Sequence, residues 1–223
     1  MPYRNNDYHP AFEEYCETIF ELQEDGVDVI QARIVERLQV SRPAVSEMIK
    51  KMADAQLVSV KKGSISLKKD GMKLANQVVR RHRLAERFLT DILGLSWAEA
   101  HHEAGKWEHV ISTSVEDAMR KVLEDPTTCP HGNPIPASDY KEPKNMANLN
   151  DLPAGADFVV ERIPEELEFT DGLLEFLEDA EIKPGNMGRI TAVSPDGTTT
   201  VEIGGNHIGV GSFASERILV SVN

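Results

Sequence analysis

The chain has 223 residues and a mass of 24.8 kDa, with 40% hydrophobic and 27% charged residues. We therefore expect a globular protein with a core, built as one large domain or as two or three small ones. No run of 18 apolar residues is present, which excludes a transmembrane helix, and the first residues lack the apolar segment of a signal peptide. With only Cys16 and Cys129, a disulfide framework is excluded and a reducing cytoplasm is expected.

Charge is distributed unevenly along the chain. The formal net charge is −13, which by itself argues against binding to nucleic acid. However, residues 29–87 have a net charge of +9, whereas residues 1–28 carry −7 and residues 88–223 carry −15. A local basic face binds a polyanion even in an acidic protein, because charges more than about 8 Å away are largely screened. A random fluctuation of surface charge is the alternative, and the size of the +9 block argues against it.

The first 70 residues show the pattern of a winged helix-turn-helix. Ser41 is a good N-cap and Pro43 suits the first turn of the helix that follows. Residues alternate around Lys61-Lys62-Gly63, which predicts a hairpin that would contact phosphate while the third helix enters the major groove. Similar layouts occur in proteins that bind no DNA, but the +9 charge favours DNA. The expected elements are helices over 9–24, 29–38 and 44–55 and a β-hairpin over 57–67.

The rest of the chain divides into a helical part and a β part. Long amphipathic stretches predict helices of a dimer interface, although packing within one subunit would need the same pattern. A stretch rich in Pro, Asn and Gly predicts an ordered loop that runs into a linker, and short strands beyond it predict a small barrel. The expected elements are helices over 70–93, 97–111, 115–123 and 171–178, a loop and linker over 126–156, and strands over 158–163, 188–193, 199–203 and 218–220.

Histidine and carboxylate residues recur at helical spacing in the middle of the chain. His82 and Glu86 are one turn apart, and Cys129 and His131 form a further pair. A single His on an apolar face is usually structural, whereas several His and Glu residues with a Cys nearby favour a divalent cation. One face of the helix expected over 97–111 carries His101, Gly105, Glu108 and His109.

Four segments of the chain are similar to one known family. They are Arg81-His82-Arg83-Leu84-Ala85-Glu86-Arg87, His101-His102-Glu103-Ala104-Gly105-Lys106-Trp107-Glu108-His109, the helix-turn-helix over 32–46, and the segment over 129–136. These segments closely resemble the diphtheria-toxin-repressor family of iron- or manganese-dependent transcriptional repressors. The resemblance covers nearly the whole chain and implies a mainly α fold with a small β domain. It implies a winged helix-turn-helix domain at 1–73, a helical metal-binding and dimerisation domain at 74–142, a linker at 143–156 and an SH3-like barrel at 157–223.

The resemblance implies two metal sites per subunit. The primary, regulatory site would use Glu108 and His109 with Glu14, where the iron branch of the family has Met and the manganese branch has Asp. The family's next ligand falls on Gly105, which can offer only its carbonyl oxygen, and Glu17 could supply the missing oxygen. This oxygen-rich set favours Mn²⁺, with Fe²⁺ as the second choice and Co²⁺, Ni²⁺, Zn²⁺ or Cd²⁺ as surrogates.

The second site implied by the resemblance can be completed in two ways. Some members use a further His and residues of the SH3-like domain, and others use a Cys-Pro-His segment. Both sets are present in this chain, so both stay open. Asp171, or alternatively Glu168, is the expected ligand from the SH3-like domain. The candidate side chains outside that domain are His82, Glu86, His101, Cys129 and His131.

The family function implied for this chain is that of a homodimeric, metal-activated repressor that binds a palindromic operator in double-stranded DNA, without an organic cofactor and away from membranes. Without metal, the carboxylates of the first helix and Glu108 repel one another, so that neutralisation would dock this helix and fix the angle of the reading head. The residues expected to face base edges are Ser41, Arg42, Pro43, Ala44, Ser46 and Glu47, and those expected to face phosphates are Lys50, Lys51, Lys61 and Lys62.

Two other functions are compatible with a metal cluster. A metalloenzyme of the carboxylate/His hydrolase type would need a spare general base and a substrate pocket. No Ser-His-Asp, P-loop or HExxH pattern is present, so we expect no enzyme activity. A helix-turn-helix protein with a purely structural metal would bind DNA with an affinity that does not depend on the metal.

Overall fold

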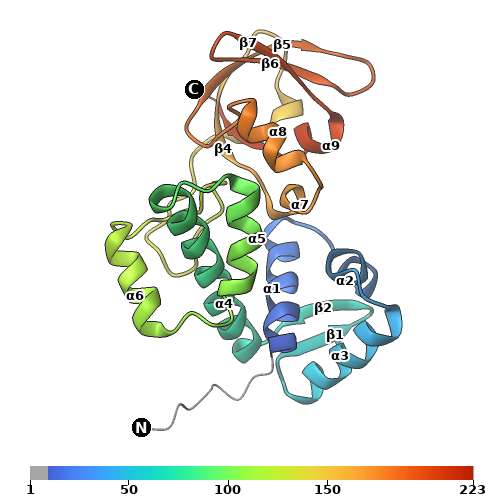
Figure 1. Cartoon of the computed structure of the whole chain (residues 1–223). Coiled ribbons are helices and arrows are strands. Elements are labelled where there is room, and N and C mark those ends of the chain that lie inside the picture. The colour runs from blue at the N-terminus through green and yellow to red at the C-terminus, as the bar shows by residue number, and fades with distance from the viewer. Residues whose placement is uncertain (1–9, 223) are drawn as a thin grey trace.

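The computed structural model describes residues 10–222, which form a β part at one end and two helical parts side by side below it (Figure 1). Helix α1 (Pro10–Glu24) lies between these two helical parts and packs against both α2 (Gln31–Leu38) and α4 (Lys69–Arg87). No helix within the described residues is long and apolar enough to cross a membrane. The mainly α fold with a small β domain is thus confirmed.

The N-terminal part is a winged helix-turn-helix, as the sequence predicts. Ser41 caps the third helix, because its hydroxyl accepts a hydrogen bond from the backbone N–H of Ala44 at 3.4 Å. Lys62 and Gly63 form the turn of the wing with φ angles of 52° and 87°, as two-residue hairpin turns require. Ile34 and Val45 are fully buried in the shared core of these helices. The elements are α1 (Pro10–Glu24), α2 (Gln31–Leu38), α3 (Arg42–Asp54), β1 (Val58–Lys61) and β2 (Ser64–Leu67).

The middle part consists of α4 (Lys69–Arg87), the π-helical turn η1 (Phe88–Ile92), α5 (Trp97–Trp107) and α6 (Thr113–Val122). The helix expected over 70–93 is present, with its last turn π-helical. The helix expected over 97–111 ends earlier, and residues 108–110 form a turn. Glu108 is thus the C-cap of α5, and His109 lies in the turn that follows it.

The C-terminal part is a six-stranded antiparallel sheet in the order β3-β8-β4-β5-β6-β7. Val160, Ile190 and Val201 are fully buried in its core. The stretch 143–156, expected as a linker, contains β3, which pairs with β8. The elements are β3 (Met146–Asn148), η2 (Leu149–Asp151), β4 (Asp157–Arg162), α7 (Glu165–Glu168), α8 (Leu173–Asp179), β5 (Met187–Val193), β6 (Thr199–Ile203), β7 (Asn206–Val210), α9 (Ser212–Ser215) and β8 (Leu219–Ser221).

A buried ion network joins the β part to the two helical parts. The fully buried Arg83 side chain of α4 binds Glu24 of α1 at 2.7 Å and Glu165 of α7 at 3.0 Å. Arg162 of β4 binds Glu24 at 2.9 Å and Asp25 at 2.7 Å. Buried charges are tolerated only when they are paired in this way. The network therefore sets where α7 lies relative to α1 and α4.

Candidate metal centre and DNA interface

Helix α1 has two faces with different partners. Tyr15, Cys16, Ile19 and Leu22 are buried in the core shared with α2, α3 and the wing. The helical period places acidic residues on the other face, toward α4 and α5. These acidic residues are Glu14, Glu17, Glu21 and Glu24. The same helix thus belongs to the DNA-reading core and to an acidic cluster.

The first candidate cation group contains Glu14, Glu108 and His109, whose ligand atoms lie within 4.8 Å of one another. Nε2 of His109 lies 3.2 Å from Oε1 of Glu14 and 3.1 Å from Oε1 of Glu108. Nδ1 of His109 lies 2.7 Å from Oε2 of Glu13, a residue that the sequence analysis missed although it is adjacent to Glu14. Hydrogen bonds to Glu13 and Glu14 raise the pKa of His109 to about 10.

Glu17, His82 and Glu108 form a second group that shares Glu108 with the first. Nδ1 of His82 lies 2.6 Å from Oε2 of Glu108. Oε1 of Glu17 is buried and has no hydrogen-bond partner within residues 10–222. Burial, together with the nearby Glu108 and Glu21 carboxylates, raises the pKa of Glu17 well above its usual range. An orphaned carboxylate oxygen among like charges is a chemical environment that fits a divalent cation.

Gly105 lies on α5 and lines a cavity of about 520 Å³ together with Glu14, Glu17 and Glu108. A Cβ atom built on Gly105 meets no heavy atom within 4 Å. The position therefore faces open space beside the first two groups. Gly105 has no side chain to offer as a ligand, but Glu17 of α1 lies close to Glu108 in the same cavity.

A third set of ligand atoms lies between α4, α5, the loop at 129–131 and α7. Nδ1 of His101 lies 3.0 Å from Oε1 of Glu86 and 3.0 Å from Oε2 of Glu168. Nδ1 of His131 also lies 3.0 Å from Oε2 of Glu168. The structure therefore brings together both sets that the sequence left open. The cation groups here are His82, Glu86, His101; Glu86, Cys129, His131; and His101, Glu165, Glu168.

Several buried ligand atoms in this set make no hydrogen bond of acceptable geometry among the described residues, although they lie close to one another. They are Oε2 of Glu86, Oε2 of Glu168, and both ring nitrogens of His131. Burial opposes ionisation of Glu168, but His131 and His101 lower its pKa to about 2. Burial raises the pKa of the Cys129 thiol well above its usual range. Buried oxygen and nitrogen atoms without such hydrogen bonds, next to the Cys129 thiol, fit a divalent cation, which takes all three kinds of ligand.

The loop that carries Cys129 and His131 is held by Gly132. Gly132 has a φ angle of 86°, and a Cβ atom there would clash with the carbonyl oxygen of Glu161 on β4. Only glycine fits this close approach. The backbone N–H of Ile163 also donates to the carbonyl of His131 at 2.8 Å. These contacts press His131 against the C-terminal part.

Asp171, expected from the sequence as a ligand, is exposed and belongs to none of the cation groups within residues 10–222. It lies in the turn before α8. Glu168 occupies the last position of α7, where the buried ion network around Arg83 holds that helix against the cluster. The structure thus brings Glu168, the alternative, and also Glu165 to the cluster. Glu165 lies in a helix too short for the sequence pattern to indicate.

The ten residues expected at DNA form an exposed surface on α3 and the wing. Nζ of Lys51 binds Oε1 of Glu47 at 2.7 Å, and this hydrogen bond lowers the pKa of Glu47. Glu47 therefore offsets the positive charge of Lys51, one of the lysines expected to face phosphates. The surface consists of Ser41, Arg42, Pro43, Ala44, Ser46, Glu47, Lys50, Lys51, Lys61 and Lys62.

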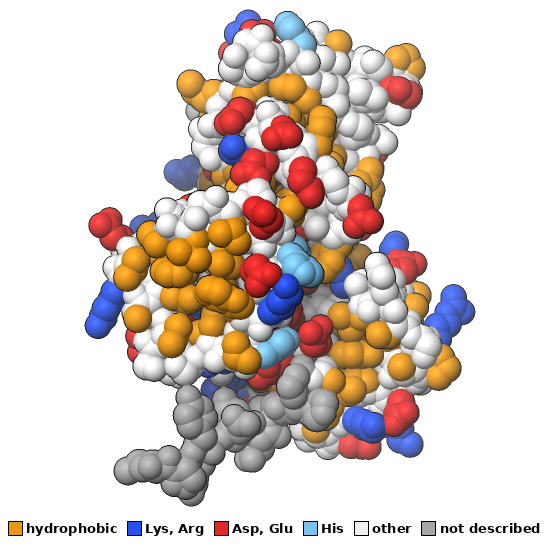
Figure 2. All heavy atoms as spheres, in the orientation of Figure 1, with side chains coloured by type: hydrophobic (Ala, Val, Ile, Leu, Met, Phe, Trp, Pro, Cys, Tyr) orange, Lys and Arg blue, Asp and Glu red, His pale blue; other side chains and the backbone are white. Residues whose placement is uncertain are grey.

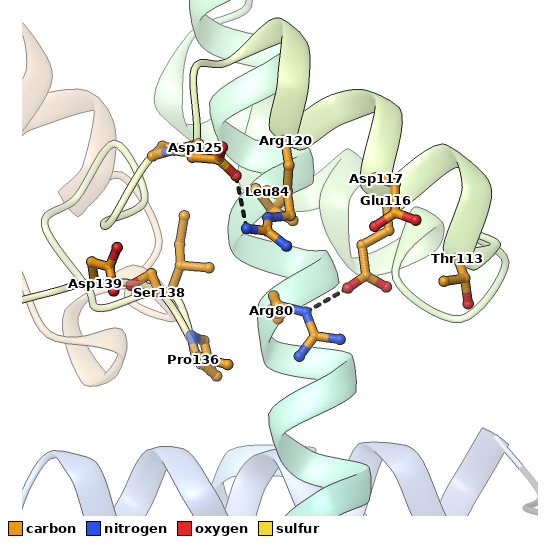
Figure 3. A pocket seen from close by; sticks show the side chains of 13 residues that line it. Arg80, Leu84, Thr113, Glu116, Asp117, Arg120, Asp125, Pro136, Ser138 and Asp139 are labelled. Atoms are coloured by element: carbon orange, nitrogen blue, oxygen red, sulfur yellow. Dashed lines mark hydrogen bonds and ion pairs between the residues drawn. The ribbon is translucent and has the colours of Figure 1, made fainter.

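A separate cavity of about 510 Å³ lies between α4, α6 and the loop at 125–139 (Figure 3). Arg80 is paired with Glu116, and Arg120 binds Asp125 at 2.7 Å. None of the cation groups found in the described part of the chain includes a residue of this cavity. Both arginines of this cavity are paired with carboxylates beside it.

The acidic and hydrophobic side chains gather on different parts of the surface. Figure 2 shows His and acidic side chains gathered where the three parts meet, and hydrophobic side chains gathered over α5 and α6. Exposed large hydrophobic residues in this middle part are Ile92, Leu93, Val110, Val115 and Val122. Exposed apolar side chains that gather on one part of a surface are typical of protein–protein contacts.

Family models match three consecutive segments of the chain. Residues 7–64 match the iron-dependent repressor N-terminal DNA-binding domain, and residues 68–137 match the iron-dependent repressor metal-binding and dimerisation domain. Residues 147–222 match the FeoA domain. The order of the matches agrees with the three parts of the fold.

Whole proteins are similar over most of their length. The iron-dependent repressor IdeR of Mycobacterium tuberculosis (strain ATCC 25618 / H37Rv) is 39% identical over 213 residues, covering 90% of this chain and 92% of the relative. The diphtheria toxin repressor of Corynebacterium diphtheriae is 48% identical over 128 residues, covering 57% of each chain. A solved structure described as a manganese-dependent transcriptional repressor in complex with manganese is 31% identical with a TM-score of 0.84, covering 95% of this chain and 100% of the other. IdeR of T. acidophilum is 27% identical with a TM-score of 0.78, covering all of both chains.

Proposed function

The chain belongs to the iron-dependent repressor family and is a metal-dependent transcriptional repressor, and from this premise we propose which ion and which residues control it. Family members are repressors and not enzymes, so the metalloenzyme alternative is set aside. We propose that Mn²⁺ is the activating ion and that each subunit holds metal at two sites.

The proposal depends on one observation, the double role of α1. Its apolar face is part of the core that carries α3, and its acidic face is part of the cluster with Glu108 and His109. When bound, a divalent cation supplies the positive charge that offsets these carboxylates. Glu14 and Glu17 then hold α1 against the turn after α5, and the same helix holds the reading head at one angle. Metal affinity and DNA affinity are therefore coupled in both directions.

The donor chemistry supports Mn²⁺ at the primary site. The proposed ligands, without thioether or thiolate, match the preference of Mn²⁺ for hard oxygen donors, and Fe²⁺ is the second choice. Co²⁺, Ni²⁺, Zn²⁺ and Cd²⁺ are proposed as surrogates. The primary set is Glu14, Glu17, Glu108 and His109, with His82 at its edge and the carbonyl oxygen of Gly105 as a further donor.

The second site is proposed to combine the two sets that the sequence left open. His101 and His131 both approach Glu168, and Cys129 shares a group with Glu86 and His131. A site of mixed oxygen, nitrogen and sulfur donors takes softer ions more readily than the primary site does.

We propose a cytoplasmic homodimer bound to a palindromic operator. A two-fold dimer presents two identical reading heads, which match two half-sites related by the same symmetry. The exposed apolar residues around η1 and α6 support the middle part as the contact between subunits.

His109→Ala tests the proposed function. We expect it to remove Mn²⁺-dependent binding to an operator selected from a random duplex pool with Mn²⁺-loaded wild-type protein, a loss of at least about tenfold. His207→Ala, an exposed His on β7, is the control and should change nothing. Circular dichroism should show that both variants keep the fold. Metal-dependent binding that survives in His109→Ala would contradict the proposal.

A further inference from the structure

Arg37 of α2 is a buried arginine with few polar partners. Its side chain is 6% exposed, and Nη1 donates to Oε2 of Glu21 at a long 3.4 Å. Nη2 is buried without a hydrogen-bond partner among residues 10–222. A buried guanidinium N–H without an acceptor is costly unless another group with negative potential lies nearby.

The group that lies nearby is an aromatic ring from the C-terminal part. The guanidinium carbon of Arg37 lies 4.3 Å from the ring centroid of Phe169. The face of an aromatic ring carries negative potential and attracts a cation at this distance. Phe169 therefore links the DNA-reading head to the β part, although it is itself 50% exposed.

Phe169 also borders the second candidate metal site. It directly follows Glu168, whose carboxylate lies 3.0 Å from both His101 and His131. The ring of Phe169 meets the ring of His101 edge-on, with 5.4 Å between centroids and an interplanar angle of 89°. Any group that fixes Glu168 and His101 fixes Phe169 from two directions, through the backbone and through the ring contact.

Arg37 in turn belongs to the helix that supports the recognition helix. Helix α2 packs against α3, and Ile34 of α2 shares the core with Val45 and Ile49 of α3. A tilt of α2 therefore moves α3. Close-packed cores transmit such displacements because they cannot absorb them.

We propose that Phe169 is a positioning residue that ties the DNA-reading head to the second metal site through Arg37. It touches neither metal nor DNA. When Glu168 and His101 are held in place, Phe169 is held in place as well, and its contact with Arg37 then fixes the orientation of α2. This inference rests on the proposed function, because it assumes that metal binding and operator binding are coupled.

Phe169→Leu tests it, since leucine keeps apolar volume but has no ring face. Phe213→Leu is the matched control, because Phe213 lies under Arg217 at 4.2 Å within the C-terminal part. In wild type and Phe213→Leu, Mn²⁺ should slow hydrogen exchange of the α2 amides about tenfold, and in Phe169→Leu by less than about threefold. Calorimetry should give the same number of bound Mn²⁺ ions in all three proteins.

Operator affinity gives the second readout, on the duplex selected from a random pool. Mn²⁺-loaded Phe169→Leu and Arg37→Gln should each bind the operator about three- to tenfold more weakly than wild type. The double variant should bind it no more weakly than whichever single variant binds less tightly, because both changes remove the same contact. If Phe169→Leu and Phe213→Leu show the same hydrogen exchange and the same operator affinity, while Mn²⁺ still strengthens operator binding by wild type, the inference is overturned and the proposed function stands. If wild type binds equally with and without Mn²⁺, both are overturned.

Discussion

Nδ1 of His109 lies 2.7 Å from Oε2 of Glu13, so that the turn after α5 contacts the first turn of α1 across 96 positions of the chain. On the other side of the same imidazole, Nε2 faces Glu14 at 3.2 Å. These two carboxylates keep the ring protonated in the metal-free protein, because they raise its pKa to about 10. His109 must therefore lose a proton from a ring nitrogen before that nitrogen can bind a metal ion.

Metal binding should therefore release protons. Below pH 10, His109 must lose a proton to become a ligand, so Mn²⁺ affinity should rise with pH, about tenfold per unit for each proton released. Glu17, whose pKa is also raised, contributes in the same way. Calorimetry in buffers of different ionisation enthalpy measures the number released. His109→Ala should lower it by about one, and His207→Ala should not; equal release in all three proteins would remove His109 from the ligand set.

Glu14→Met should change the ranking of metals. The substitution replaces a hard anionic oxygen with a soft neutral sulfur, so Mn²⁺ affinity should fall more than Co²⁺ or Fe²⁺ affinity. Anaerobic calorimetry with each ion measures the ranking. Glu175→Met, an exposed position on α8, is the control. If Glu14 is merely a solvated acid, affinity and ranking will both stay as in wild type.

Gly105→Glu should raise metal affinity. A Cβ atom at this position meets no heavy atom within 4 Å, and the site lies beside Glu17 and Glu108 in the same cavity. Gly105→Ala separates the two effects of the change, because it adds about 0.5–1 kcal/mol of helix stability without adding a ligand. We expect tighter Mn²⁺ binding in Gly105→Glu alone. Equal Mn²⁺ affinity in both variants would show that the position does not face the metal.

Lys51→Ala should weaken binding to every DNA sequence alike. Lys51 is exposed on α3, where its partner is Glu47 at 2.7 Å. If Lys51 contacts a DNA phosphate, loss of that contact should reduce the salt dependence of binding by about one unit of slope. Lys106→Ala is the control, since Lys106 is equally exposed on α5 and is paired with Glu103. Affinity measured against salt concentration checks it. Unchanged affinity and slope would count against the placement of α3 on DNA.

The middle part should form the dimer contact. Leu93 is 52% exposed beside η1, so Leu93→Asp should shift the protein toward monomer at micromolar concentration. Val193→Asp, at a 50% exposed position on β5, is the control and should leave the dimer intact. Sedimentation in the presence of Mn²⁺ measures both. A wild-type protein of only 24.8 kDa under these conditions would rule the dimer out.

The sequence by itself determined the winged helix-turn-helix and the helices of the middle part. Their apolar periodicity, the Ser41 cap and the turn at Lys62 and Gly63 are local signals, and each acts within a few residues of the chain. The resemblance to a known family added the ligand candidates on α1 and after α5. Strand β7 was not predicted because its residues, Asn, His and Gly among them, have weak strand preferences. Strand β3 was not predicted for the same reason, since two of its three residues are Ala and Asn.

Only the tertiary structure decided which side chains meet. The position of Glu168, and not Asp171, in the cluster depends on Arg83 and Glu165, which lie 82 positions apart in the chain. The convergence of His101 and His131 on Glu168 depends on the packing of α5, a loop and α7. The contact between Arg37 and Phe169 likewise joins distant segments. Such contacts follow from how whole elements pack and from which buried charges must be paired. The spacing of neighbouring residues in the sequence determines neither of these.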